Sequence, residues 1–147
     1  MAEGGVVHIE DVSVTETWAR LASDAKSVLI DVRTRAEWAY VGLPDLSGIG
    51  KQIILVEWQT FPDNRIDPGF AGTLREALDA TGVEKDAELF FICRSGGRSR
   101  MAAVVMAEAG DACCRNVAPG FEGPLDAERH RGRTSGWKAA GLPWVQG

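Results

Sequence analysis

The chain has 147 residues, and its 16 lysine and arginine residues against 21 aspartate and glutamate residues give a net charge of −5 at pH 7. With 45% hydrophobic and 25% charged residues, the composition is that of a globular protein rather than a disordered one, and the length suits a single domain spanning residues 1–147. The acidic balance also argues against a nucleic-acid partner, because neutralising phosphates takes clustered lysine and arginine residues.

The sequence carries no signal for a membrane, an export pathway or a metal. Its longest apolar run, Met101 to Ala107, is seven residues long, whereas a helix needs roughly 20 to span a bilayer. The N-terminus lacks the basic start and apolar stretch of a signal peptide, so we expect a cytoplasmic protein. The three cysteines form no CxxC pair, and His8 and His130 lie far apart, so neither a disulfide framework nor a metal site is expected.

The first half of the chain is predicted to alternate between strands and helices. Val6 to Val12 is interpreted as a short strand, followed by a helix that Thr15 caps and that carries Trp18, Ala19 and Leu21 on one face. The apolar run Val28–Ile30, closed by Asp31, predicts a strand buried on both faces. A capped helical turn from Thr34 to Tyr40 and a strand from Ile53 to Trp58 complete this half.

The second half continues the alternation. We expect a surface loop from Thr60 to Gly69, a helix with Phe70, Leu74, Ala77 and Leu78 on its inner face, and a strand from Leu89 to Ile92. A helix with Met101, Val104, Val105 and Ala109 at helical spacing follows, then a strand from Ala112 to Ala118, and then a loop with at most one short helix from Pro119 to Gly136. Such alternation favours an α/β fold with a mostly parallel central sheet, whose functional crevice lies at the carboxyl ends of the strands.

Cys93 comes directly after one of these strands. A cysteine reacts as its thiolate, which nearby cations and a helix N-terminus favour. Arg94, Arg98 and Arg100 supply positive charge in a window, residues 89–101, that contains no acidic residue. The sequence therefore predicts an activated thiolate, which a sulfur enclosed by aliphatic neighbours, with its adjoining amides turned away and no opening to water, would contradict.

The residues between Cys93 and the helix favour the binding of an anion. Gly96 and Gly97 permit positive φ angles, so that backbone N–H groups can form a nest around the sulfur. Ser99 is the expected cap of the following helix and would direct its N–H groups at the same place. The alternative is that Cys93 is a small core residue at a strand end.

Three segments resemble the rhodanese-like sulfurtransferase family. CRSGGRS at residues 93–99 is similar to the active-site loop of the family, LIDVRTRAEW at residues 29–38 to its first motif, and GWKAAGLPW at residues 136–144 to its C-terminal motif. The resemblance implies a single rhodanese domain with a five-stranded sheet flanked by helices on both faces. The chain departs from the family at residues 41–46, where only Pro44 matches the usual turn sequence.

The resemblance also implies a mechanism and a set of site residues. Cys93 would take sulfane sulfur from a small anionic donor such as thiosulfate and pass it, as a persulfide, to cyanide, a thiol or an acceptor protein, without a cofactor. The substrate-binding residues would be those of the loop: Arg94, Ser95, Gly96, Gly97, Arg98 and Ser99. Asp31 and Arg33 match the first motif, and we interpret them as structural supports that pair with each other.

Two other functions stay open on the sequence. The domain could be a sulfur-relay or sensing module that a partner protein loads, which would use the same cysteine. It could also be a cysteine-dependent phosphatase or arsenate reductase, although such phosphatases place an arginine at the sixth residue after the cysteine, where this chain has Ser99.

Cys113 and Cys114 are interpreted as packing residues, with a resolving role toward Cys93 as the alternative. The basic residues Arg129, His130, Arg131 and Arg133 form either a solvated loop, a rim of the site or a docking patch for an acidic partner.

Overall fold

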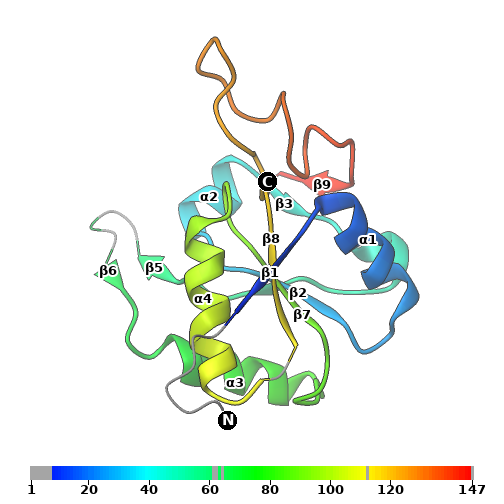
Figure 1. The fold of residues 1–147 in the computed structure, drawn as a ribbon, viewed down its shortest axis with the longest axis vertical. Coiled ribbons are helices and arrows are strands. Elements are labelled where there is room, and N and C mark those ends of the chain that lie inside the picture. Colours follow the sequence, from blue (N-terminus) through cyan, green and yellow to red (C-terminus); the bar gives the residue numbers. More distant parts are fainter. Residues whose placement is uncertain (1–7, 61–62, 64, 112, 147) are drawn as a thin grey trace.

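A five-stranded sheet forms the centre of the molecule (Figure 1). The computed structural model describes residues 8–60, 63, 65–111 and 113–146. The strand order is β1-β8-β7-β2-β4, and every neighbouring pair is parallel. The strands are Glu10–Val12 (β1), Val28–Asp31 (β2), Ile54–Leu55 (β4), Leu89–Ile92 (β7) and Cys114–Val117 (β8). This arrangement confirms the predicted α/β fold and its parallel sheet.

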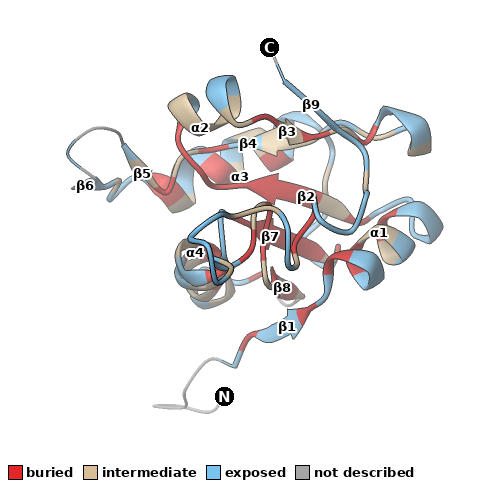
Figure 2. Ribbon diagram, turned by 90° about the horizontal axis from the view of Figure 1, so that it is seen from above, coloured by how far each residue is buried: buried red, intermediate tan, exposed pale blue. Residues whose placement is uncertain are grey.

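Helices cover both faces of the sheet. They are Val14–Ser23 (α1), Arg35–Tyr40 (α2), Phe70–Ala80 (α3) and Gly97–Glu108 (α4), with a short 3-10 helix at Ser47–Ile49 (η1). Because successive strand residues point to opposite faces, Phe90 packs in the hydrophobic cluster that contains Leu21 of α1, whereas Phe91 packs in the cluster of α3 and α4. Figure 2 shows the buried residues concentrated in the central strands. Among the described residues, no helix is long and apolar enough to cross a bilayer.

Two small antiparallel sheets add to this centre. Leu43–Pro44 (β3) pairs with Trp144–Val145 (β9), and Gln59–Thr60 (β5) pairs with Arg65–Ile66 (β6). The first sheet ties the C-terminal segment to the domain, and Trp137 is fully buried in the α1 cluster. The predicted surface loop at residues 60–69 therefore holds part of a hairpin, which its polar composition did not indicate.

The predicted cap of α1 and the predicted inner face of α4 are wrong. Ser13, not Thr15, caps α1, because its Oγ accepts the N–H of Glu16 at 3.1 Å. In α4 the buried residues are Ser99, Ala102, Ala103 and Met106, whereas Met101 is 54% exposed. A run of consecutive apolar residues has no periodicity that selects a face, and the small alanines are the residues that let the helix approach the sheet closely.

Some predicted element ends differ from the observed ones, and others cannot be compared with them. Residues 6 and 7 of the first predicted strand, and residue 112 of the last, lie outside the described residues. The strand predicted from Ile53 to Trp58 pairs in the ladder only at β4, although the N–H groups of Val56 and Trp58 still donate to the carbonyls of Asp31 and Val32. Residues 119–136 contain no helix and form turns and bends.

Candidate active site

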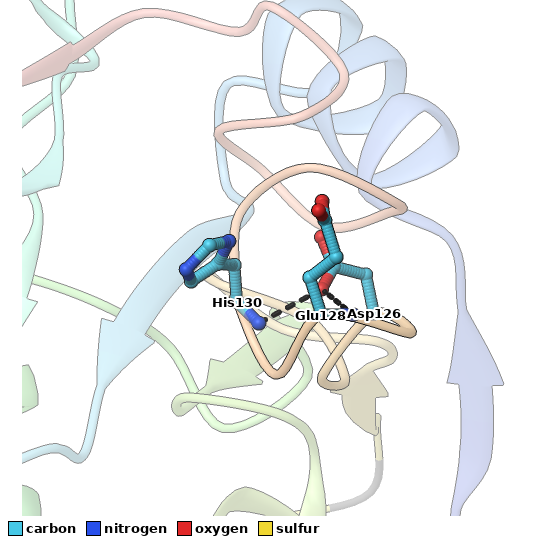
Figure 3. Close-up of side chains that lie close together, drawn as sticks. All are labelled: Asp126, Glu128 and His130. Carbon is cyan, nitrogen blue, oxygen red and sulfur yellow. Dashed lines mark hydrogen bonds between the residues drawn. The ribbon is translucent and has the colours of Figure 1, made fainter.

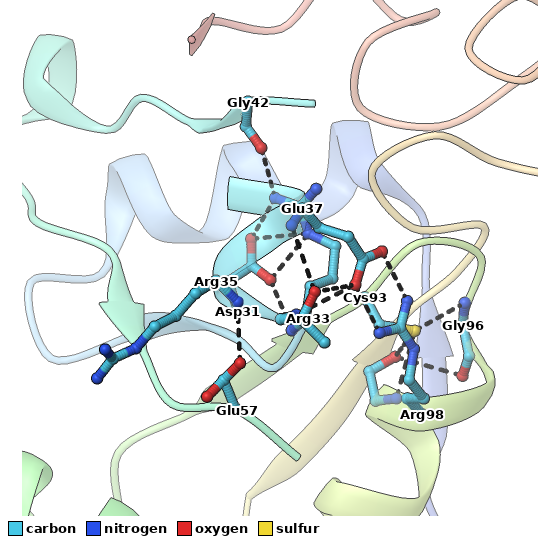
Figure 4. Close-up of polar contacts among 11 residues, drawn as sticks. Asp31, Arg33, Arg35, Glu37, Gly42, Glu57, Cys93, Gly96 and Arg98 are labelled. Atoms are coloured by element: carbon cyan, nitrogen blue, oxygen red, sulfur yellow. Dashed lines mark hydrogen bonds and ion pairs between the residues drawn. The ribbon is translucent and has the colours of Figure 1, made fainter. Parts of the chain in front are cut away.

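Cys93 lies at the carboxyl end of β7, on the sheet face that α4 covers, and three donors surround its sulfur (Figure 4). The sulfur accepts the N–H of Gly96 at 3.2 Å, the N–H of Ser99 at 3.4 Å and the hydroxyl of Ser99 at 3.2 Å. The backbone amides thus point at the sulfur, as the interpretation of the loop requires. Of the features that would contradict the predicted thiolate, enclosure is present, because Cys93 is only 1% exposed, whereas amides turned away from the sulfur are not.

The geometry of the loop depends on a glycine and on the chain that follows β8. Gly96 is the N-cap of α4 and has a φ of 118°, which residues with a Cβ rarely adopt. The carbonyl of Cys93 accepts the N–H of Phe121 at 2.8 Å, and the carbonyl of Arg94 accepts the N–H of Glu122 at 3.0 Å. Gly120 permits this approach, since a Cβ there would lie 2.7 Å from both carbonyl oxygens. With its carbonyls held outward, the loop directs its N–H groups inward.

Ser99 has a different role from the predicted one. It does not cap α4 but lies in its first turn, fully buried, where its Oγ contacts Asn116 Oδ1 at 2.5 Å. Asn116 was not among the site residues predicted from the sequence. A polar residue inside an otherwise buried strand was the available signal, because buried amides are normally hydrogen-bonded to something specific.

Arg98 is paired with an acidic residue from another part of the chain. Its guanidinium donates to both carboxylate oxygens of Glu37, at 2.8 Å and 2.9 Å, from the first turn of α4 across to α2 (Figure 4). The absence of acidic residues near Cys93 in the sequence therefore does not mean an unopposed positive site. Glu37 had a detectable signal, since Thr34 and Glu37 form the T-x-x-E capping box at the start of α2.

This ion pair sets the charge state of Glu37. Burial by itself raises the pKa of the carboxyl, but hydrogen bonds from Arg98 and Thr34 more than offset it and lower the pKa from 4.5 to about 2. The same pairing raises the pKa of Arg98. Both side chains are therefore charged at neutral pH.

A cavity of about 780 Å³ opens beside the loop. It is lined by residues from α2 and the loop together with parts of the later chain: Thr34, Ala36, Glu37, Tyr40, Val41, Gln59, Arg94, Arg98, Glu122 and Arg131. Arg94 is exposed at its edge, as are Ser95 and Gly97 at the surface of the loop. Arg100 points elsewhere, because its guanidinium contacts the Ile9 carbonyl and pairs with Asp11. Of the three arginines, Arg94 is exposed, Arg98 pairs with Glu37 at the cavity, and Arg100 pairs with Asp11 away from it.

Asp31 and Arg33 form a fully buried pair beneath the site. Arg33 Nη2 lies 2.6 Å from Asp31 Oδ2 and also donates to the Gly42 carbonyl at 2.8 Å. The guanidinium carbon stands 4.3 Å from the centre of the Phe121 ring. These contacts join the end of β2 to the turn after α2 and to the chain that follows β8, and neither residue lines the cavity.

Cys113 and Cys114 lie at the opposite end of the sheet from Cys93. Cys114 stands opposite Leu89 in the β7–β8 register, four residues before Cys93. That offset corresponds to about 13 Å, whereas a disulfide needs Cα atoms within about 7 Å. The alternative of a resolving cysteine is therefore wrong in this fold. Burial raises the pKa of the Cys114 thiol to about 12.

The basic run near residue 130 is partly engaged within its own loop. Arg131 lines the cavity and donates to the Gly123 carbonyl at 2.8 Å, and Arg133 lies 3.4 Å from Glu128. Asp126, Glu128 and His130 offer ligand atoms within 4.8 Å of one another (Figure 3). However, the Asp126 carboxylate already accepts the backbone N–H groups of Glu128 and His130, as in an ordinary Asx turn, so the cluster is explained as a turn.

The fold and the loop define the class of protein. A family model for the rhodanese-like domain matches residues 13–126, so the chain belongs to the rhodanese-like domain family. Solved structures of similar fold include a rhodanese-related protein from Thermoplasma volcanium and a rhodanese-like domain protein from Staphylococcus aureus, with TM-scores of 0.55 and 0.52.

Particular relatives are similar over nearly the whole chain. The crystal structure of Rv0390 from M. tuberculosis shares 43% identity and a TM-score of 0.85, covering 96% of this chain and 100% of that one. The uncharacterized protein RC0915 of Rickettsia conorii is 33% identical over 92% of this chain and 97% of its own length. The polysulfide-sulfur transferase homodimer of Wolinella succinogenes has a TM-score of 0.58 at 18% identity, over 95% of this chain and 80% of that one, a likeness of fold alone.

Proposed function

We propose that this protein is a sulfurtransferase that carries sulfane sulfur as a persulfide on Cys93. The observation that supports it is the set of three donors on the Cys93 sulfur, two backbone N–H groups and the Ser99 hydroxyl. Donors that converge on one sulfur stabilise negative charge there, which is the requirement of a thiolate nucleophile and of its persulfide. Membership of the rhodanese-like family agrees with this chemistry.

The reaction has two steps. The Cys93 thiolate attacks the outer sulfur of thiosulfate, forming a new S–S bond, while the S–S bond of the donor breaks and sulfite leaves with its electron pair. An acceptor such as cyanide or a thiolate then attacks the terminal sulfur of the persulfide, and the Cys93 thiolate is released. Residues 94–99 bind the donor, with Arg94 as the exposed cation that meets the anion first. Asp31 and Arg33 support the loop indirectly, because Arg33 packs on Phe121, whose N–H donates to the Cys93 carbonyl.

A second candidate is a sulfur-relay module that a partner protein loads. It is favoured by the 1% exposure of Cys93 and by the pairing of Arg98 with Glu37, because a free anion must compete for that arginine and reach a covered sulfur. A partner that docks at the cavity could separate the ion pair as it delivers sulfur. The cytoplasmic location stays a prediction under either candidate.

Intact-mass measurement tests the proposal. After thiosulfate treatment we expect the protein to gain one sulfur atom that cyanide or a reductant removes, and the Cys93→Ala variant to gain none. Cys113→Ala is the matched control and should still load. Loading only from a donor protein supports the relay. Sulfur retained by Cys93→Ala would contradict both candidates, as would hydrolysis of an aryl phosphate that is lost in Cys93→Ser.

A further inference from the structure

Asn116 lies behind the cysteine loop, on β8, and contacts both residues that donate to the sulfur. It is 1% exposed and does not line the cavity. Its Nδ2 donates to the Gly96 carbonyl at 3.1 Å, and its Oδ1 accepts from Ser99 at 2.5 Å. We propose that Asn116 is a positioning residue for Cys93, acting through Gly96 and Ser99. This inference rests on the proposed function in one respect, that Cys93 is the nucleophile.

The orientation of the Asn116 amide is fixed by its surroundings. Nδ2 faces two acceptors, the Gly96 carbonyl at 3.1 Å and Asp11 Oδ1 at 3.0 Å. A flipped amide would place its oxygen against both of them and leave both unpaired. Oδ1 therefore faces Ser99, where it can accept the hydroxyl proton but has none to donate.

The Ser99 hydroxyl has a single proton and three acceptors around it. They are Asn116 Oδ1 at 2.5 Å, the Cys93 sulfur at 3.2 Å and the Gly96 carbonyl at 3.3 Å. While Cys93 is a thiol, the hydroxyl donates to Asn116. When the sulfur is an anion, the hydroxyl turns and donates to it. Because Asn116 Nδ2 already serves the Gly96 carbonyl, that carbonyl does not draw the hydroxyl away by the back-bond that serines in helices often form.

Removal of Asn116 has an expected direction. In Asn116→Ala the Gly96 carbonyl loses its side-chain donor and captures the Ser99 hydroxyl, so the sulfur keeps its amides but loses its third donor. Loss of one hydrogen bond to an anion corresponds to about a 10-fold lower rate. Since Asn116 does not line the cavity, the KM for thiosulfate should stay within about 2-fold, and the loss should be in kcat.

The experiment uses iodoacetamide alkylation of Cys93 at pH 7, followed by peptide mass, beside thiosulfate kinetics. Alkylation reports the nucleophile even if the protein transfers no sulfur, so failure of the proposed function and failure of this inference are distinguishable. We expect alkylation to fall about 10-fold in Asn116→Ala and in Ser99→Ala, and the double variant to lose less than about 3-fold more. Asp11→Ala is the control, because the Gly96 carbonyl still orients the amide, and it should stay within about 2-fold.

Three outcomes of these measurements would overturn the proposal. Faster alkylation in Asn116→Ala would overturn the proposal, because a purely structural brace would loosen the loop and expose the buried sulfur. Full additivity with Ser99→Ala, or a raised KM at unchanged kcat, would also overturn it. If Asn116→Ala does not fold, the similarly sized Asn116→Leu replaces it, and this variant is expected to lose about as much because it has neither the donor for the Gly96 carbonyl nor the acceptor for Ser99.

Discussion

Removing the charge of Glu37 tests whether the ion pair across the site contributes to stability. In Glu37→Gln the side chain keeps its length and one oxygen, but the bidentate contact with Arg98, at 2.8 Å and 2.9 Å, loses its charge. The side chains of Arg98 and Glu37 are 22% and 19% exposed, so water screens the pair only in part. We expect the variant to fold and to be less stable at neutral pH.

The magnitude follows from the pKa of Glu37. A lowering from 4.5 to about 2 corresponds to an upper limit of about 3 kcal/mol, which partial solvent screening reduces to about 1–2 kcal/mol. For a chain of this length that is a Tm about 3 to 6 °C lower than that of the parent. Because the folded pKa lies below its ordinary value, the contribution is complete above about pH 5 and is lost as the pH falls from 4.5 toward 2.

Thermal or urea denaturation of the two proteins between about pH 7 and pH 3 measures this contribution. The difference in unfolding free energy between them should shrink to less than about half by pH 3. Glu76→Gln, which removes an exposed carboxylate on α3, is the matched control and should show no such trend. A difference that stays constant across this pH range would refute the reasoning, since it would then come from packing and not from the charge of Glu37.

Three further outcomes follow from the geometry. Arg94→Ala should raise the KM for thiosulfate about 10-fold in the cyanide assay, while the unfolding free energy stays within about 0.5 kcal/mol because the side chain is exposed. Unchanged KM would assign donor binding elsewhere. Asp31→Ala should cost about 3–5 kcal/mol in urea denaturation, because it leaves the buried Arg33 guanidinium without its counter-ion. A cost below about 1 kcal/mol would contradict that. Cys114, with a pKa of about 12, should stay unmodified by iodoacetamide at pH 8 in the folded protein, because only about one thiol in 10,000 is then ionised. Alkylation of Cys114 at the rate of Cys93 would contradict the burial.

The sequence predicted a helix or strand correctly where the apolar pattern of that element was sufficient by itself. β2 and β7 are apolar runs too short for helices and are buried on both faces, and α3 buries Phe70, Leu74 and Leu78 at the predicted spacing. The prediction was wrong where the pattern lacked a period, as in α4, or where pairing was set by distant partners. The β3–β9 pair joins Leu43–Pro44 to Trp144–Val145, and no local feature of either segment indicates the other.

Only part of the candidate site could be predicted from the sequence. The position of Cys93 at a strand end and the glycine that begins α4 follow from residues adjacent in sequence. Glu37 and Asn116 do not, because they reach the loop from 61 and 17 residues away along the chain. Burial of the sulfur also depends on packing against elements far apart in sequence.

By itself the sequence determined that this protein has an acidic α/β domain with a cysteine at the end of a buried strand, since composition, apolar runs and turn residues act over short distances along the chain. Only the tertiary structure decided which charges meet at that cysteine. Glu37 pairs with the arginine expected to be free, and Asn116 holds the serine expected to be a cap. The physical reason is that the energy of charges and hydrogen bonds depends on distances in space, and folding sets those distances between residues whose separation in sequence carries no information about them.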